Sequence, residues 1–285
     1  MNLLLVFRVC AAIFMAGSLM AAGLTVTPRD LRVPLTHARF VALSLVFGWV
    51  VGPLLAIVLV RVIPLDRSYA TGLLLLSLAP CAPPAAASAR RAGADPAYIA
   101  GFIVLSAVAT VVVMLVAVPL MIDGLSANAW GILRPLLLLV LLPLLAGMWV
   151  NGRWPRTAAR IVGPLESITR LVGVLLLLLV AILFGPRVIE AVGSLAIVAQ
   201  VAFLGAMTLI SWTCAFGLSH QQKSVLPLGM ATRNLAAAGA PLLAVDHDPR
   251  VVVMLAITVP VMVVLSTLAR HWIGRRVRPA VAELA

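Results

Sequence analysis

The chain has 285 residues, of which 63% are hydrophobic and only 11% are charged. A soluble domain contains about 45–50% apolar and about 25% charged residues, so this composition excludes an ordinary soluble enzyme, a disordered chain and a nucleic-acid-binding domain. The formal charge of +12 does not change this, because only one of the 21 basic residues is a lysine and they form no basic stripe on a soluble face. The composition indicates an all-α polytopic membrane protein.

A membrane-spanning helix needs about 20 mostly apolar residues, and the chain has nine such segments joined by short, charged connectors. We interpret the first as a retained span and not a signal peptide, because Arg8 interrupts it and a basic loop follows. No segment is long enough for a separate soluble domain, so we expect one transmembrane unit over 1–285. The nine predicted spans are Leu3–Val26, Phe40–Ile63, Tyr69–Ala89, Ala97–Ile122, Ile132–Val150, Ile168–Phe184, Leu195–Leu218, Ser224–Val245 and Val251–Ile273.

The basic residues predict the orientation. With the N-terminus outside, 14 of them lie on the cytoplasmic side and six on the outer side, and Arg233 is left over. Cytoplasmic loops carry the excess of Lys and Arg. We therefore expect a multi-pass protein of the inner (plasma) membrane, with its N-terminus outside and residues 275–285 as a cytoplasmic tail.

Two of the predicted spans are abnormal. The third contains three prolines in Pro80–Pro84, which cannot continue a regular helix, and the eighth has proline and glycine over Pro227–Pro241. Each is followed by a favourable helix start, Asp95-Pro96 and Asp248-Pro249. Spans two to four and seven to nine therefore resemble two copies of one unit with inverted topology. Secondary transporters use this plan, with a substrate site where the broken helices meet; alternatively, proline and alanine only allow close helix packing here.

The ionisable residues do not suggest an enzyme. All nine acids and all four histidines lie in loops or at span ends, so no catalytic constellation or proton relay is predicted. The cysteines Cys10, Cys81 and Cys214 lie far apart inside apolar stretches, which predicts neither disulfides nor a metal site.

Arg233 is the exception, about ten residues into an apolar span. A charge at that depth normally faces the interior and meets a partner. It could pair with an anionic substrate, or it could bind carbonyls freed by the break at Pro83-Pro84. The other Ser and Thr residues in spans are expected mostly to bond their own backbone or a neighbouring helix. The candidate substrate-binding residues are Arg233, Asn234, Thr232, Pro80, Cys81, Pro83 and Pro84.

Several segments resemble those of the bile acid:sodium symporter family, and the resemblance covers nearly the whole chain. They are Ala21–Val26 followed by Pro28–Leu31, the proline at Pro53, Pro80 with the later Gly93–Asp95, and Gly229–Ala236. The resemblance implies a panel domain (approximately 1–38 and 131–190) and a core domain (approximately 39–127 and 193–274) with two broken, crossing helices. It also implies uptake of organic anions, often coupled to sodium.

The chain departs from the family where sodium would bind. The family's Ser-Asn pair falls on Ala85-Ala86, its Gly-Gly pair on Cys81-Ala82, its glutamate near Pro227-Leu228 and a glutamine on Gly48. Sodium is a hard cation that needs several oxygen ligands, so sodium remains possible but is not supported by side-chain ligands, and no cofactor is expected. We hypothesise that Arg233 acts as a tethered cation instead.

We therefore predict a secondary transporter for a small organic anion, in contact with the lipid bilayer and not with nucleic acid. The alternatives are a related exporter of the same plan, of the arsenite or auxin type, and a membrane receptor or partner subunit that no longer transports.

Overall fold

The computed structural model describes residues 3–27, 29–83, 85–121, 129–243 and 247–282, and within these ranges the chain is helical with no β-strand. Seven helical segments are long and apolar enough to cross a membrane. They are Leu3–Leu24, Ala38–Val62, Pro96–Leu120, Trp130–Arg153, Pro155–Ala191, Ala196–Thr213 and Pro249–Arg276. Each overlaps one of the nine predicted spans.

The third and eighth predicted spans are interrupted helices in the structure. The third consists of α5 (Arg67–Ser77) and α6 (Ala85–Ala92). The eighth consists of α12 (His220–Met230), α13 (Leu235–Gly239) and a 3-10 turn, η3 (Ala240–Leu243). The interruptions fall within the proline- and glycine-rich segments, as predicted. Because no piece is long enough to cross alone, the total of nine spans stays a prediction.

Two other spans contain a π turn that the sequence analysis did not predict. One span comprises α3 (Ala38–Val46), η1 (Phe47–Val51) and α4 (Gly52–Val62), and the other comprises α8 (Ala129–Leu136), η2 (Leu137–Leu141) and α9 (Leu142–Arg153). Each π turn ends two residues before a proline, Pro53 or Pro143. A proline ring clashes with the carbonyl four residues earlier, and the wider π turn relieves that clash.

The remaining helices are α1 (Leu3–Leu24), α2 (Arg32–Thr36), α7 (Pro96–Met121), α10 (Pro155–Gly193), α11 (Ala196–Thr213) and α14 (Pro249–Ala282). Helix α10 is kinked at Phe184, where φ is −128°. The kink precedes Gly185-Pro186, and the predicted sixth span ends at the same residue.

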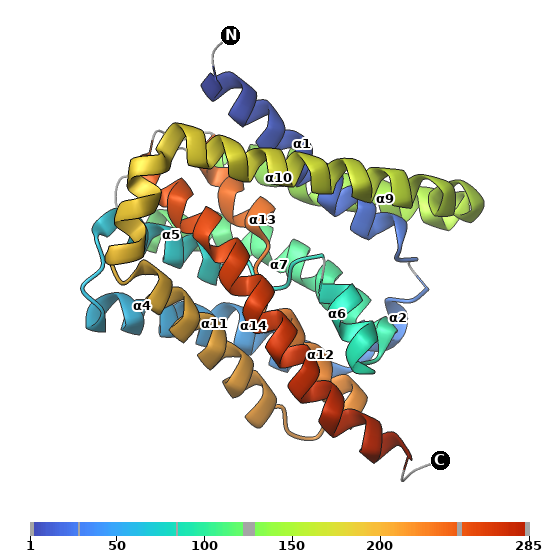
Figure 1. The fold of residues 1–285 in the computed structure, drawn as a ribbon. Coiled ribbons are helices and arrows are strands. Elements are labelled where there is room, and N and C mark those ends of the chain that lie inside the picture. Colours follow the sequence, from blue (N-terminus) through green and yellow to red (C-terminus); the bar gives the residue numbers. More distant parts are fainter. Residues whose placement is uncertain (1–2, 28, 84, 122–128, 244–246, 283–285) are drawn as a thin grey trace.

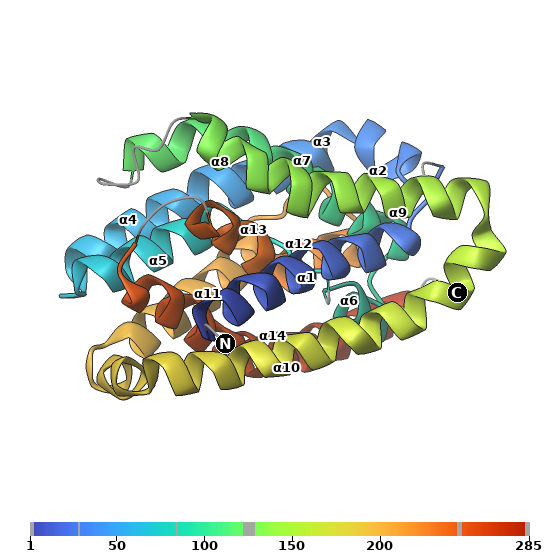
Figure 2. The same cartoon turned by 90° about the horizontal axis from the view of Figure 1, so that it is seen from above.

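Helices α1, α9 and α10 form one layer, seen at the top of Figure 1. Figure 2 looks onto this layer, in which α1 lies between α9 and α10. Helix α1 meets α9 at two glycines. A Cβ atom on Gly23 would lie 2.2 Å from the carbonyl oxygen of Leu144, and one on Gly147 would lie 2.4 Å from that of Met20. In the other layer α14 packs against α5, α6, α11 and α12.

Both predicted Asp-Pro helix starts are confirmed. Asp95 accepts the amide of Ala97 at 2.9 Å at the start of α7, and Asp248 accepts the amide of Arg250 at 2.8 Å at the start of α14. The Arg250 side chain also forms ion pairs of 2.8 Å with Asp248 and with Asp66, which precedes α5. Hydrogen bonds from the Arg250 side chain hold the pKa of Asp248 at about 2, so this carboxylate stays charged at physiological pH.

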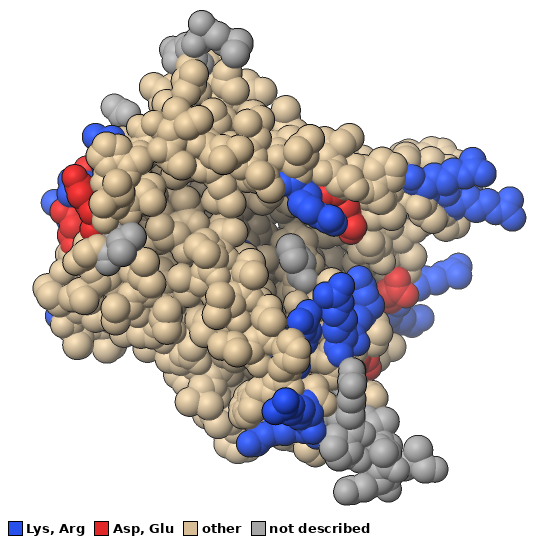
Figure 3. Space-filling view, in the orientation of Figure 1, with Lys and Arg blue, Asp and Glu red and all other residues tan. Residues whose placement is uncertain are grey.

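Charge is distributed unevenly along the molecule. Lys and Arg gather toward one end, near α6 and the C-terminus, and the opposite end carries a mixed acidic and basic group (Figure 3). Much of the surface between them is uncharged (Figure 3). Basic residues at the first end include Arg90, Arg91, Arg153, Arg156, Arg275 and Arg276.

Candidate functional site

The two interrupted helices cross, and their extended segments pair as an antiparallel bridge. The amide of Cys81 donates to the carbonyl of Thr232 at 3.2 Å, and the amide of Asn234 donates to the carbonyl of Ala79 at 2.9 Å. Because hydrocarbon offers no hydrogen-bond partners, a broken helix at membrane depth must be satisfied by protein. The crossing brings together five of the predicted site residues: Pro80, Cys81, Thr232, Arg233 and Asn234.

The carbonyls that the break leaves free at the end of α5 each accept a hydrogen bond from another part of the chain. Side chains from three other parts of the chain donate to three of them, and the Asn234 amide donates to the fourth. The side-chain bonds run from Arg233 Nη1 to Ser77 O (3.4 Å), from Trp49 Nε1 and Thr110 Oγ1 to Leu78 O (3.1 and 3.2 Å), and from Ser106 Oγ to Pro80 O.

Arg233 is fully buried, with no exposed surface. Its guanidinium lies over the ring of Phe203, at 4.6 Å from the centroid. Atoms Nε and Nη2 have no hydrogen-bond partner among the described residues. The inward position is as expected. The carbonyl that Nη1 meets is one that the break leaves free, as one of the two expected roles had it, but it belongs to Ser77 at the end of α5.

The two unpartnered nitrogens of Arg233 lie on the same edge of the guanidinium plane. The Nε–H and Nη2–H bonds on that edge are nearly parallel, which matches the two oxygens of a carboxylate. No described Asp or Glu forms an ion pair with Arg233, and no group of three His, Cys, Asp or Glu side chains in the described ranges could hold a metal ion. Within the described ranges, the edge is therefore a donor pair without an acceptor.

The neighbours of Arg233 hold the backbone in this conformation. Thr232 Oγ1 donates to the carbonyl of Gly229 and accepts the amide of Ala82, and Asn234 Oδ1 accepts the amide of Ala237 as the N-cap of α13. Among the other candidates, Cys81 is buried with a positive φ of 61° and Pro83 is half-buried. Pro84 lies outside the described residues.

Phe203 and Trp49 belong to the site but were not predicted as site residues. Both lie in apolar helices, where an aromatic residue is usually part of the hydrophobic core. They reach the site only because α11 and η1 pack against the crossing. Gly48, where the resemblance places a glutamine, also faces the crossing. A Cβ atom there would lie 3.1 Å from Cγ of Pro80, so there is little room for a longer side chain.

A family model described as the sodium bile acid symporter family matches residues 12–192, which is more than half of the chain. The chain belongs to the sodium bile acid symporter family. Members of this family are transporters and not enzymes, and together with the apolar helices this makes the protein a multi-pass membrane protein. A comparison with curated proteins finds no match.

The family match includes only one side of the crossing. Residues 12–192 contain α5 and α6, but α12 and α13 lie beyond them. The residues from Thr232 to Asn234 are therefore assigned to the site by the geometry of the crossing.

Proposed function

We propose that this protein is a secondary transporter that carries a small organic anion, with a carboxylate bound at Arg233. One observation supports this most strongly: Arg233 is fully buried and presents Nε and Nη2 without an acceptor from any residue that the structure describes. A buried charge without a counter-charge is costly, and a carboxylate that accepts both N–H groups would offset that cost. Because the guanidinium has no exposed surface in this conformation, the anion reaches it only when the crossing region opens to one side.

The proposed architecture has nine spans, which include two inverted repeats. The protein would lie in the inner membrane, with its N-terminus outside and its C-terminus in the cytoplasm. Two observations support it: α5 and α12 enter the crossing antiparallel, and basic residues gather at the end that holds α6 and the C-terminus. The layer of α1, α9 and α10 would be the panel, and the remaining helices would be the core that carries the substrate.

Arg233 would take the place of bound sodium in this proposal. Its guanidinium supplies a fixed positive charge at the crossing, where a carboxylate in the family would help to hold the cation. The acids of this chain lie at span ends, and the carbonyls at the end of α5 already accept hydrogen bonds from protein donors. Sodium would therefore find few free oxygen ligands and a like charge nearby.

Binding of a panel of small carboxylates to purified Arg233→Ala and Arg233→Lys variants tests the proposal. Hydrogen bonds to charged groups contribute about 1.5–3 kcal/mol each, so Arg233→Ala should weaken carboxylate binding at least about a hundredfold. Arg233→Lys should keep part of the affinity, because the charge remains while the planar fork is lost. Arg134→Ala, the same change at an exposed arginine, is the matched control and should bind as the parent protein does.

Melting temperature on the same variants separates binding from structure. A purely structural Arg233 would make Arg233→Ala melt much lower, with poor rescue by Lys and no selective loss of binding. Parent-like carboxylate affinity in well-folded Arg233→Ala protein would end the proposal.

A further inference from the structure

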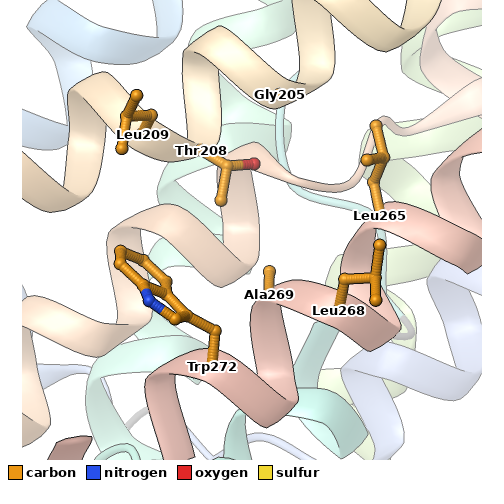
Figure 4. Close-up of a pocket in the computed structure, with 7 residues that line it drawn as sticks. All are labelled: Gly205, Thr208, Leu209, Leu265, Leu268, Ala269 and Trp272. Atoms are coloured by element: carbon orange, nitrogen blue, oxygen red, sulfur yellow. The ribbon is translucent and has the colours of Figure 1, made fainter.

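A groove of about 240 Å³ runs between α11 and α14, apart from the crossing. Figure 4 shows side chains of the two helices facing each other across it. A Cβ atom on Gly205 would meet nothing within 4 Å, so the missing side chain leaves the groove open. Leu209 and Leu268 on its edges are 56% and 60% exposed, which is the exposure of lipid-facing residues. The lining residues are Gly205, Thr208, Leu209, Leu265, Leu268, Ala269 and Trp272.

One end of the groove carries two aromatic rings and two cations. The rings of Trp272 and Trp212 lie 5.2 Å apart. The Arg276 guanidinium lies 4.8 Å from the Trp272 ring, and the Lys223 ammonium lies 5.0 Å from the Trp212 ring. Neither cation forms an ion pair with a described carboxylate. Trp, Lys and Arg together are typical of the membrane–water interface.

We propose that this groove is a binding site for an anionic glycerophospholipid. One acyl chain lies in the apolar groove between Gly205 and Trp272, and the phosphate lies at Lys223 and Arg276. The groove and this lipid are complementary in charge: an apolar slot that ends at two cations without a described carboxylate partner matches a molecule with an apolar chain and an anionic head. A second copy of this chain could cover the apolar groove, but it would not by itself neutralise the cations.

Quenching of tryptophan fluorescence tests this site. The full-length protein is placed in phosphatidylcholine vesicles, and phosphatidylglycerol or phosphatidylcholine with brominated acyl chains is titrated in. Bromine quenches any tryptophan that it touches, so the exposed Trp130, Trp149 and Trp154 are first replaced by phenylalanine. The remaining signal then includes Trp272, which lines the groove. We expect stronger quenching by brominated phosphatidylglycerol. Each of Lys223→Gln and Arg276→Gln should reduce that preference about fivefold, because the attraction of one cation to an anionic lipid surface changes binding by about that factor.

Two glycine variants test the groove itself. Gly205→Leu should place a side chain in the groove and reduce quenching by both lipids, and its Cβ atom meets nothing within 4 Å. Gly163→Leu is the matched control, because Gly163 is exposed on α10 and a Cβ atom added there also meets nothing within 4 Å. This variant should leave the quenching by both lipids unchanged. Melting temperatures confirm that all variants are folded.

Three results would overturn the proposal. The first is equal quenching by the two lipids in the parent protein. The second is a preference for phosphatidylglycerol that survives in the double Lys223→Gln, Arg276→Gln variant. The third is a parent protein that is a dimer in detergent and a Gly205→Leu variant that is a monomer, with unchanged quenching. The last result would assign the groove to contact between copies of this chain.

Discussion

Cys81 occupies a backbone position that suits glycine. Its φ of 61° is in the left-handed region, which costs a residue with a Cβ atom about 1–2 kcal/mol. The resemblance places a glycine of the family at this position. The turn that leads from α5 to the crossing therefore carries a strained residue at a position where glycine would be unstrained.

Comparing glycine with alanine at Cys81 measures this strain without the thiol. Cys81→Gly should be more stable than Cys81→Ala by about 1 kcal/mol, because only glycine adopts positive φ freely. The order should reverse at Cys10, which is buried inside helix α1, since alanine is favoured over glycine there by about 1 kcal/mol. Chemical unfolding in detergent gives the four values. The same order at both cysteines would contradict the assignment of strain.

At the residue scale, the sequence identified Arg233 but not its partners. A lone arginine in an apolar span is a local signal that needs no knowledge of the fold. The Phe203 ring and the Ser77 carbonyl come from other helices, and nothing in their own sequence surroundings distinguishes them from ordinary core residues.

Among the helices, α1 and α9 approach each other closely at Gly23 and Gly147. The atoms that an added Cβ would meet are backbone oxygens, and backbone cannot move aside as a flexible side chain can. In membranes, small residues at such positions allow the van der Waals packing that holds helices together.

Gly147→Ala should therefore separate α1 from α9 and lower the stability by about 1–3 kcal/mol, the usual cost of overpacking. Gly163→Ala on α10, where an added Cβ meets nothing within 4 Å, should instead be neutral or slightly stabilising. Thermal unfolding of the two variants in the same detergent checks this. Equal melting temperatures would mean that the two helices can part without cost.

The interrupted helices show what could be predicted at the element scale. Pro80 and the caps at Asp95 and Asp248 act within one or two turns, so the sequence alone predicts the break after α5 and both helix restarts. Pro227 lies inside α12, which continues to Met230, so the second break does not follow from that proline. The antiparallel pairing of Cys81 with Thr232 joins segments from distant parts of the chain. The π turn at Phe47–Val51 relieves a proline clash. Because a helix can relieve such a clash in several ways, the sequence does not predict that it does so with a π turn.

On the scale of the whole molecule, apolar length predicted the seven long spans that the structure describes, and proline predicted the interruption between α5 and α6. The close approach of α1 and α9 and the kink of α10 depend on packing between helices, and composition says little about either. The Asp66–Arg250–Asp248 cluster was also missed, because it joins the start of α5 to the start of α14.

Transport that does not depend on sodium is the prediction at this scale. Vesicles that contain the protein should take up a carboxylate equally well when sodium is replaced by potassium or choline, because Arg233 already supplies the positive charge. Protein-free vesicles control for leakage. A steep rise of uptake with sodium concentration would show that free carbonyls elsewhere suffice as ligands.

The hydrogen bonds across the crossing have a further consequence. The amides of Cys81 and Asn234 each donate to a carbonyl of the opposite segment, so each can trade its proton for deuterium only when that pairing opens. If the segments part together during the transport cycle and reclose more slowly than the amides exchange, the two amides exchange at a common rate. Deuterium uptake at these positions would then time the opening without a substrate or an attached probe.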